Sequence, residues 1–164
     1  MSFAPMLKYR ADHLFYQELT AFAVSIVENE INLVANLANL SSLIFHSLPN
    51  LNWAGFYLWS ESDQELILGP FQGKPACIRI KPSRGVCGKS YSEQKVLNVS
   101  NVNDFPDHIA CDSESLSELV IPIIINQKCL GVLDLDSPLI NNFSLIDQQE
   151  MEKLIICMAP KIFK

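Results

Sequence analysis

The sequence contains no long hydrophobic run, although hydrophobic residues make up 49% of its 164 residues. Its longest apolar stretch, residues 119–125, is seven residues long and contains Pro122, whereas a membrane-spanning helix needs about 20 residues. The first twenty residues place basic residues after apolar ones and include Asp12 and Glu18, unlike a secretory signal. We therefore expect a cytoplasmic protein that does not enter a membrane.

Basic charge is also scarce. Lysine and arginine number 12 against 18 aspartate and glutamate residues, which gives a formal net charge of −6. This balance repels a phosphate backbone, and no segment clusters basic and aromatic residues, so nucleic acid is not an expected partner. The length and the absence of low-complexity segments predict one compact domain over residues 1–164.

Pairs of the CxxC or HxxxH type are missing as well, and the only close pair of histidine and cysteine is His108 with Cys111. The cysteines are Cys77, Cys87, Cys111, Cys129 and Cys157. An odd number in a chain of this size argues against a secreted disulfide framework. Without a CxxC or HxxxH pair, a zinc site built from Cys77, Cys87, Cys111 and His108 is not encoded locally, and we expect no metal.

The apolar pattern predicts the secondary structure. Helical spacing over residues 12–48 predicts two helices with Asn29 as a cap between them, and Ser144 with Asp147 predicts a capping box before a last helix. Strands are expected at residues 53–59, 65–68, 76–80, 96–99, 118–125 and 129–135. Residues 126–128 suit a hairpin between the last two strands. The predicted class is α+β, an antiparallel sheet of about six strands flanked by helices.

Two carboxylates stand out in the last predicted strand. Strict alternation over residues 130–136 places Asp134 and Asp136 on one face, and Glu118 opens the preceding strand of the same hairpin. Carboxylates this close repel one another, so the arrangement requires solvent, a metal, a bound cation or a shared proton.

The cysteines divide into two groups. Cys129 shares strand parity with Leu133 and Leu135, and Cys157 lies among apolar residues of the last helix, so both are predicted to be core residues. Cys111 lies in an acidic loop, where a packing role is hard to assign. With Cys77 and Cys87, which flank a turn, it suggests thiol–disulfide exchange.

The segment around Cys87 ends like a phosphate-binding loop but has Ser83 at the first glycine position. Gly85 and Gly88 are better explained by a tight turn at the start of a short helix reaching Gln94. Backbone amides of that helix are expected to favour a Cys87 thiolate.

Several of these segments together resemble the free methionine-(R)-sulfoxide reductases, small enzymes built on a GAF domain. The resemblance covers most of the chain and rests on residues 52–58, 68–74, 76–77, 85–88, 108–112, 117–118 and 131–137. It implies a single GAF domain that reduces free methionine-R-sulfoxide without a cofactor. It further implies a cytosolic homodimer whose thiols are restored by thioredoxin.

The resemblance also implies residue roles. Cys111 corresponds to the attacking thiol, Cys77 to the main resolving thiol and Cys87 to a further redox-active thiol. The substrate-binding positions are Trp53, Tyr57, Glu118, Asp134 and Asp136. The aromatic residues would enclose the S-methyl group. Asp136 and Glu118 are expected to hold the ammonium, with Asp134 near the sulfoxide oxygen.

The alternative from another functional class is a GAF module that senses a small molecule or an oxidant through its thiols without turnover. Catalytic release of methionine distinguishes the enzyme from the sensor.

Overall fold

The computed structural model describes residues 7–107 and 112–164. Its elements in chain order are α1 (His13–Val27), α2 (Leu33–Ser47), β1 (Trp53–Ser60), β2 (Glu65–Gly73), β3 (Arg79–Ile80), α3 (Gly85–Glu93), β4 (Leu97–Val99), the 3-10 turn η1 (Val102–Asp104), β5 (Ser117–Ile125), β6 (Lys128–Ser137) and α4 (Leu145–Ile162). In these described residues, no helix has both the length and the apolar character of a membrane span.

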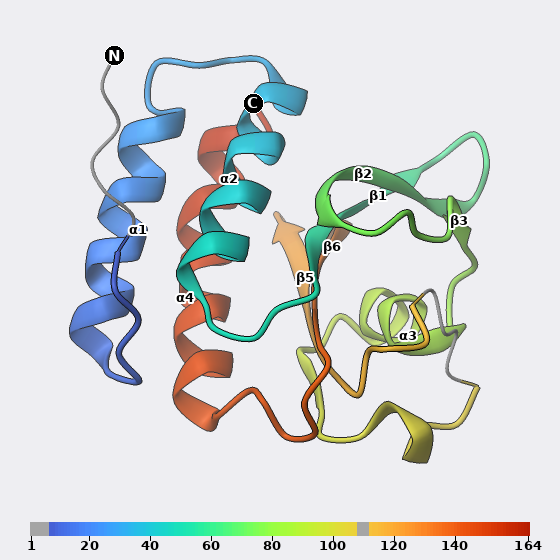
Figure 1. Ribbon diagram of the computed structural model, residues 1–164. Coiled ribbons are helices and arrows are strands. Elements are labelled where there is room, and N and C mark those ends of the chain that lie inside the picture. The colour runs from blue at the N-terminus through green and yellow to red at the C-terminus, as the bar shows by residue number, and fades with distance from the viewer. Residues whose placement is uncertain (1–6, 108–111) are drawn as a thin grey trace.

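The six strands form one sheet in the order β3-β2-β1-β6-β5-β4, with every neighbouring pair antiparallel. Helices α1, α2 and α4 lie on one side of the sheet and α3 lies on the other (Figure 1). The predicted α+β class, with helices flanking an antiparallel sheet, is confirmed.

Alternating side chains give the sheet two apolar faces. Ile121 and Leu133 belong to the main core with the three-helix layer, whereas Val120 and Val132 belong to a smaller cluster with Val86 of α3. The smaller cluster leaves room beside α3 for polar groups, and the candidate site lies there.

Side-chain caps define the helix starts. Asp12 accepts a hydrogen bond from the Phe15 amide at 2.8 Å, and Asn32 accepts one from the Ala35 amide at 2.9 Å. The prediction of Asn29 as the cap is therefore wrong, since Asn32 is the residue that satisfies an unpaired amide of the first turn of α2. The capping box of Ser144 and Asp147 is confirmed.

Other boundaries also differ from expectation. The strand predicted at 76–80 is only Arg79–Ile80, whereas β2 continues to Gly73. The last hairpin has a two-residue turn instead of three, with φ of 50° at Asn126 and 65° at Gln127, as a tight primed turn requires.

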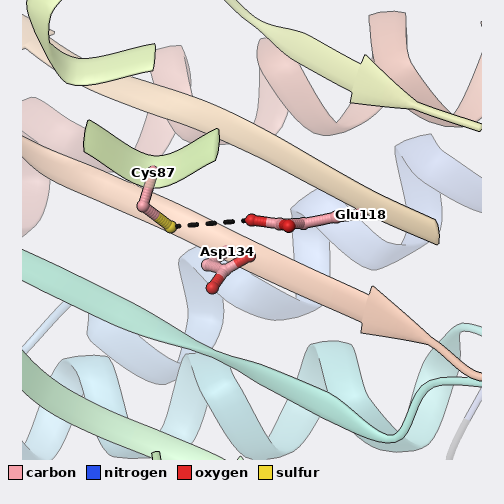
Figure 2. Close-up of side chains that lie close together, drawn as sticks. All are labelled: Cys87, Glu118 and Asp134. Atoms are coloured by element: carbon pink, nitrogen blue, oxygen red, sulfur yellow. Dashed lines mark hydrogen bonds between the residues drawn. The ribbon is translucent and has the colours of Figure 1, made fainter. Parts of the chain in front are cut away.

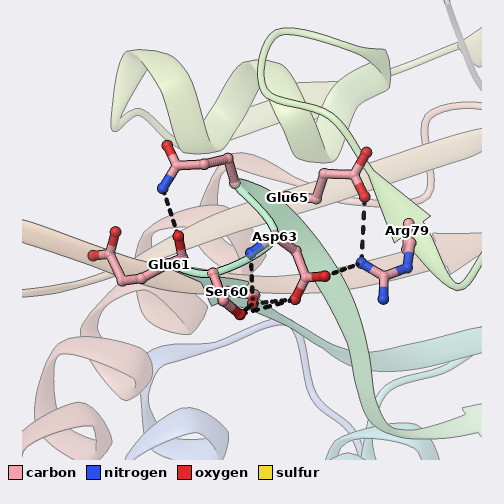
Figure 3. A network of polar contacts seen from close by, with 7 residues as sticks. Ser60, Glu61, Asp63, Glu65 and Arg79 are labelled. Atoms are coloured by element: carbon pink, nitrogen blue, oxygen red, sulfur yellow. Dashed lines mark hydrogen bonds and ion pairs between the residues drawn. The ribbon is translucent and has the colours of Figure 1, made fainter.

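A polar network joins β3 to the turn between β1 and β2 (Figure 3). Arg79 donates to Asp63 at 2.9 Å and lies 3.5 Å from Glu65, while Ser60 donates to Asp63 at 2.5 Å. These contacts fix the chain immediately after Cys77 to the edge of the sheet.

Candidate active site

Three carboxylates lie side by side on the α3 face of the sheet. Glu118 pairs with Asp136 across β5 and β6, and Asp134 pairs with Gly55 across β6 and β1. Glu118 is 5% exposed, Asp134 is 7% exposed and Asp136 is half-buried. The predicted same-face arrangement is confirmed, and burial removes the solvent that would otherwise screen the charges. Glu118, Asp134 and Asp136 are called the acidic wall below.

Aromatic residues of β1 and β2 adjoin the acidic wall. The ring of Trp53 stacks on Tyr57 at 5.9 Å and on Phe71 at 5.2 Å between centroids. The Trp53 indole donates to the Lys74 carbonyl at 3.1 Å, and the Tyr57 hydroxyl donates to the Cys77 carbonyl at 2.9 Å. The two aromatic residues therefore line the site and also hold the segment that carries Cys77.

Gly55 makes the close approach of these rings possible. A Cβ atom at this position would lie 2.3 Å from Cβ of Phe71 and 2.6 Å from the ring of Trp53. The pairing of β1 and β2 shifts register at the same place, between Gly55 and Tyr57. A glycine is therefore required where the strands bulge under the aromatic stack.

Two adjoining cavities share Asp112, Asp134 and Asp136 in their lining. One is bounded by the aromatic residues Trp53 and Tyr57. The other is bounded by Glu118 and by Cys87 at the start of α3. Carboxylates beside aromatic rings suit a ligand that combines a positive charge with an apolar group.

Burial dominates the protonation of the acidic wall. It raises the pKa of Glu118 and of Asp136 well above the ordinary value, with the Asp134 charge adding to the effect in both. Burial also raises the pKa of Asp134 to about 6, although hydrogen bonds from Cys87 and Glu118 oppose the shift. The cluster therefore retains at least one proton near neutral pH, which makes it a proton donor as well as an anionic surface.

The structure overturns the prediction of a Cys87 thiolate. Cys87 is 4% exposed, and its burial, with Asp134 and Glu118 nearby, raises the pKa of the thiol well above the ordinary value. The desolvation and the carboxylates outweigh the amides of the first turn of α3. Cys87 therefore remains a thiol and is a poor first nucleophile.

Of the other residues predicted to take part in the chemistry, some lie near the same cavities and others lie outside the described residues. Cys77 is half-buried and disulfide-bonded. Cys111 and His108 lie outside the described residues. Asp112, the residue that follows Cys111 in the sequence, lines both cavities.

Cys129 and Cys157, the two cysteines predicted to be core residues, differ in their burial. Cys129 is 5% exposed, which confirms the prediction that it is buried. The strand parity used for that prediction does not hold, however, because the pairing of β5 with β6 shifts between Ile123 and Ile124. Burial raises the pKa of Tyr91 in α3 to about 12, and the nearby Cys129 adds to this shift. Cys157 is half-buried against the main core.

Sequence reasoning missed the polar residues that connect the cavity walls. The Lys74 ammonium lies 3.4 Å from Asp112 and 2.5 Å from Glu114. Asn52 donates to Ser115 at 3.0 Å and contacts Asp112 at 3.4 Å. Lys74 ends a motif noted in the sequence, yet its partners are about 40 residues away, and only the tertiary fold brings them together.

The family model described as "GAF domain" matches residues 25–155. The chain belongs to the GAF domain family. Protein YtsP of Bacillus subtilis is 52% identical over 82% of this chain and 82% of its own length. The free methionine-R-sulfoxide reductase of Escherichia coli is 42% identical over 86% of this chain and 84% of its own.

Among solved structures, this GAF domain is similar to the free methionine-R-sulfoxide reductase of Neisseria meningitidis in complex with its substrate. The two share 36% identity and a TM-score of 0.90, over 97% of this chain and 95% of the other. The structural similarity therefore covers nearly all of this chain.

Proposed function

We propose that this GAF domain protein is an enzyme that reduces free L-methionine-(R)-sulfoxide to methionine. The observation that carries the proposal is the acidic wall directly beside the stacked rings of Trp53 and Tyr57. Relatives that cover more than four-fifths of the chain bear the name of this reductase. The proposal assigns the wall to the ammonium and the sulfoxide oxygen, and the rings to the S-methyl group.

The chemistry needs a thiolate and an acid. The Cys111 thiolate attacks the sulfoxide sulfur, while a carboxyl of the acidic wall protonates the oxygen. The hydroxyl is then transferred from the substrate sulfur to the Cys111 sulfur as the bond between the two sulfurs breaks, so methionine leaves and Cys111 becomes a sulfenic acid. The Cys77 thiol then attacks that sulfur, water leaves and a disulfide forms. The two electrons that reduce the sulfoxide thus come from two thiols.

Contacts around Cys77 support its assignment as the resolving residue. The residue is disulfide-bonded, and its carbonyl is held by the Tyr57 hydroxyl on the wall of the cavity. The raised pKa of Cys87 supports a secondary role for this thiol, as a partner in exchange and not as the attacking group.

The remaining parts of the proposal concern partners and location. Thioredoxin, which attacks exposed protein disulfides through its own paired thiols, is the proposed reductant. The protein is proposed to act in the cytoplasm as a homodimer and to need no cofactor.

The test is release of methionine from resolved diastereomers of the free sulfoxide under excess reductant. Many turnovers with the R form, and loss of at least a thousandfold in rate in Cys111→Ser, support the proposal. Cys157→Ser is the matched control, because this thiol lies on α4 and is expected to leave the rate unchanged. Stoichiometric oxidation of the thiols without turnover would instead identify a redox-sensing GAF module.

A further inference from the structure

Three potential metal ligands converge at the inner end of the site (Figure 2). They are Cys87 from α3, Glu118 from β5 and Asp134 from β6, and their ligand atoms all lie within 4.8 Å of one another. The Cys87 sulfur is 3.9 Å from Oε1 of Glu118. All three residues are buried, so the convergence is fixed by packing and is not a chance cluster on a solvated surface.

A second observation indicates that this cluster takes a positively charged ligand. Among the described residues, Oδ1 of Asp134 has no hydrogen-bond partner, although this atom is buried and the residue is only 7% exposed. Leaving a buried acceptor unsatisfied destabilises the folded state, and more so when the acceptor is charged. The nearby Lys74 ammonium does not meet this need, because it pairs with Asp112 and Glu114.

We propose that Cys87, Glu118 and Asp134 bind a divalent cation of the zinc class, and that this cation and the substrate exclude each other. One thiolate and two carboxylates favour Zn²⁺, Co²⁺ or Cd²⁺ over Mg²⁺ and Ca²⁺, which take oxygen ligands. The fourth position is open to water or to Asp136, which lines the same cavity.

The observed spacing fits such an ion after small side-chain movements. Zinc bonds of about 2.3 Å to sulfur and about 2.0 Å to oxygen place those two atoms about 3.5 Å apart at a tetrahedral angle. The observed separation of 3.9 Å is therefore wider by a few tenths of an ångström. Rotation about the side-chain bonds of Glu118 is sufficient to close this difference.

Binding is an exchange of protons for the metal, with no change of oxidation state. The Cys87 thiol loses its proton as sulfur binds the ion, and any proton held between Glu118 and Asp134 is released. The two positive charges of the ion then replace those protons. Mutual exclusion with substrate rests on the proposed function, because the same carboxylates are assigned there to the ammonium and the sulfoxide oxygen.

A cobalt titration tests the metal site without any turnover. Chelator-treated protein is kept reduced with a phosphine, because the paired thiols of dithiothreitol bind zinc themselves. Wild type is expected to develop the near-ultraviolet charge-transfer band of a cobalt thiolate with one ion per chain. Cys87→Ser is expected to lose that band, and Asp134→Asn to bind cobalt at least tenfold more weakly.

Matched variants assign the ligand. Cys157→Ser and the double variant Cys77→Ser/Cys111→Ser are expected to retain the band. Its loss in the double variant, or its persistence in folded Cys87→Ser, would overturn the proposal. If Cys87→Ser does not fold, X-ray absorption of zinc-loaded wild type decides. One sulfur at about 2.3 Å with oxygen neighbours supports the site, whereas two sulfurs or none would refute it.

A kinetic measurement tests mutual exclusion. Zinc is expected to raise the KM for methionine-R-sulfoxide at least tenfold while leaving kcat unchanged at saturating substrate. A fall in kcat with an unchanged KM would place the ion away from the substrate and refute the exclusion. Absence of turnover in metal-free buffer would refute the proposed function instead, and the cobalt band would still report on the metal site.

Discussion

Individual residues of the acidic wall serve the proposed function and also lower the stability of the folded protein. Asp134 is held between β1 and β5 and is almost fully buried, and one of its carboxylate oxygens has no partner within residues 7–107 and 112–164. Such an arrangement destabilises the folded state whenever the group ionises. A binding site for an ammonium or a metal requires this unsatisfied charge, so we expect stability and activity to oppose each other at this position.

Asp134→Asn tests that opposition. The folded-state pKa is raised from 3.8 to about 6, so the stabilising contribution is complete below about pH 4 and is lost as the pH rises through 6. In chelator-treated protein at pH 8, the variant should be more stable than wild type by up to about 3 kcal/mol. Chemical denaturation at pH 4 and pH 8 measures this difference.

The advantage of Asp134→Asn should disappear toward pH 4, where the wild-type carboxyl is protonated. The same variant should lower kcat more than it raises KM, because this carboxyl is assigned to the sulfoxide oxygen. A variant that is less stable than wild type at pH 8 would show that ionised Asp134 is satisfied within the fold.

At the scale of elements, the segments that carry or adjoin the proposed redox cysteines are joined by a few polar contacts. Lys74, which directly follows β2, pairs with Asp112 and Glu114, and its carbonyl accepts a hydrogen bond from the Trp53 indole. Lys74 therefore connects the segment that precedes Cys77 to the residues that follow Cys111. We expect it to position these segments relative to the cavity.

Lys74→Met tests this bridge. Loss of the ammonium should lower kcat about tenfold, because small displacements of reacting groups are costly. The free energy of unfolding should change little, as for other exposed ion pairs. Lys128→Met is the matched control, since Lys128 is 58% exposed against 57% for Lys74 and pairs with Glu61 at 2.6 Å. Equal kinetics in the two variants would rule out positioning by Lys74.

The register shift between β1 and β2 gives a second prediction about these elements. Gly55→Ala places a methyl group against Phe71 and the ring of Trp53, and such overpacking costs about 1–3 kcal/mol. The displaced rings should raise KM more than they lower kcat. Near-ultraviolet circular dichroism and steady-state kinetics measure both effects. An unchanged aromatic spectrum with wild-type KM would show that the stack does not depend on this glycine.

Sequence patterns predicted the secondary structure best where residues close together in the chain determine it. Alternation placed Asp134 and Asp136 correctly because β6 is regular over those residues, and the capping box at Ser144 depends on residues three apart. Alternation failed for Cys129 because of the irregular pairing between β5 and β6. No local pattern records such a shift.

At the scale of the whole molecule, the fold separates stability from chemistry. The three-helix layer and one face of the sheet form the main core, and the opposite face carries the acidic wall, the aromatic stack and α3. The α+β class followed from the order of apolar patterns in the sequence. The partnership of Lys74 with Asp112 and the raised pKa of Cys87 did not, because both depend on burial and on contacts between distant segments.

The proposed specificity depends on recognition of the amino group of a free amino acid by the acidic wall. Specificity constants for free and N-acetylated methionine-R-sulfoxide test it most directly. Leaving a buried charge without its partner costs about 3–5 kcal/mol, so acetylation should lower kcat/KM by at least a hundredfold. Comparable specificity constants for the two substrates would contradict the claim that the wall recognises the ammonium.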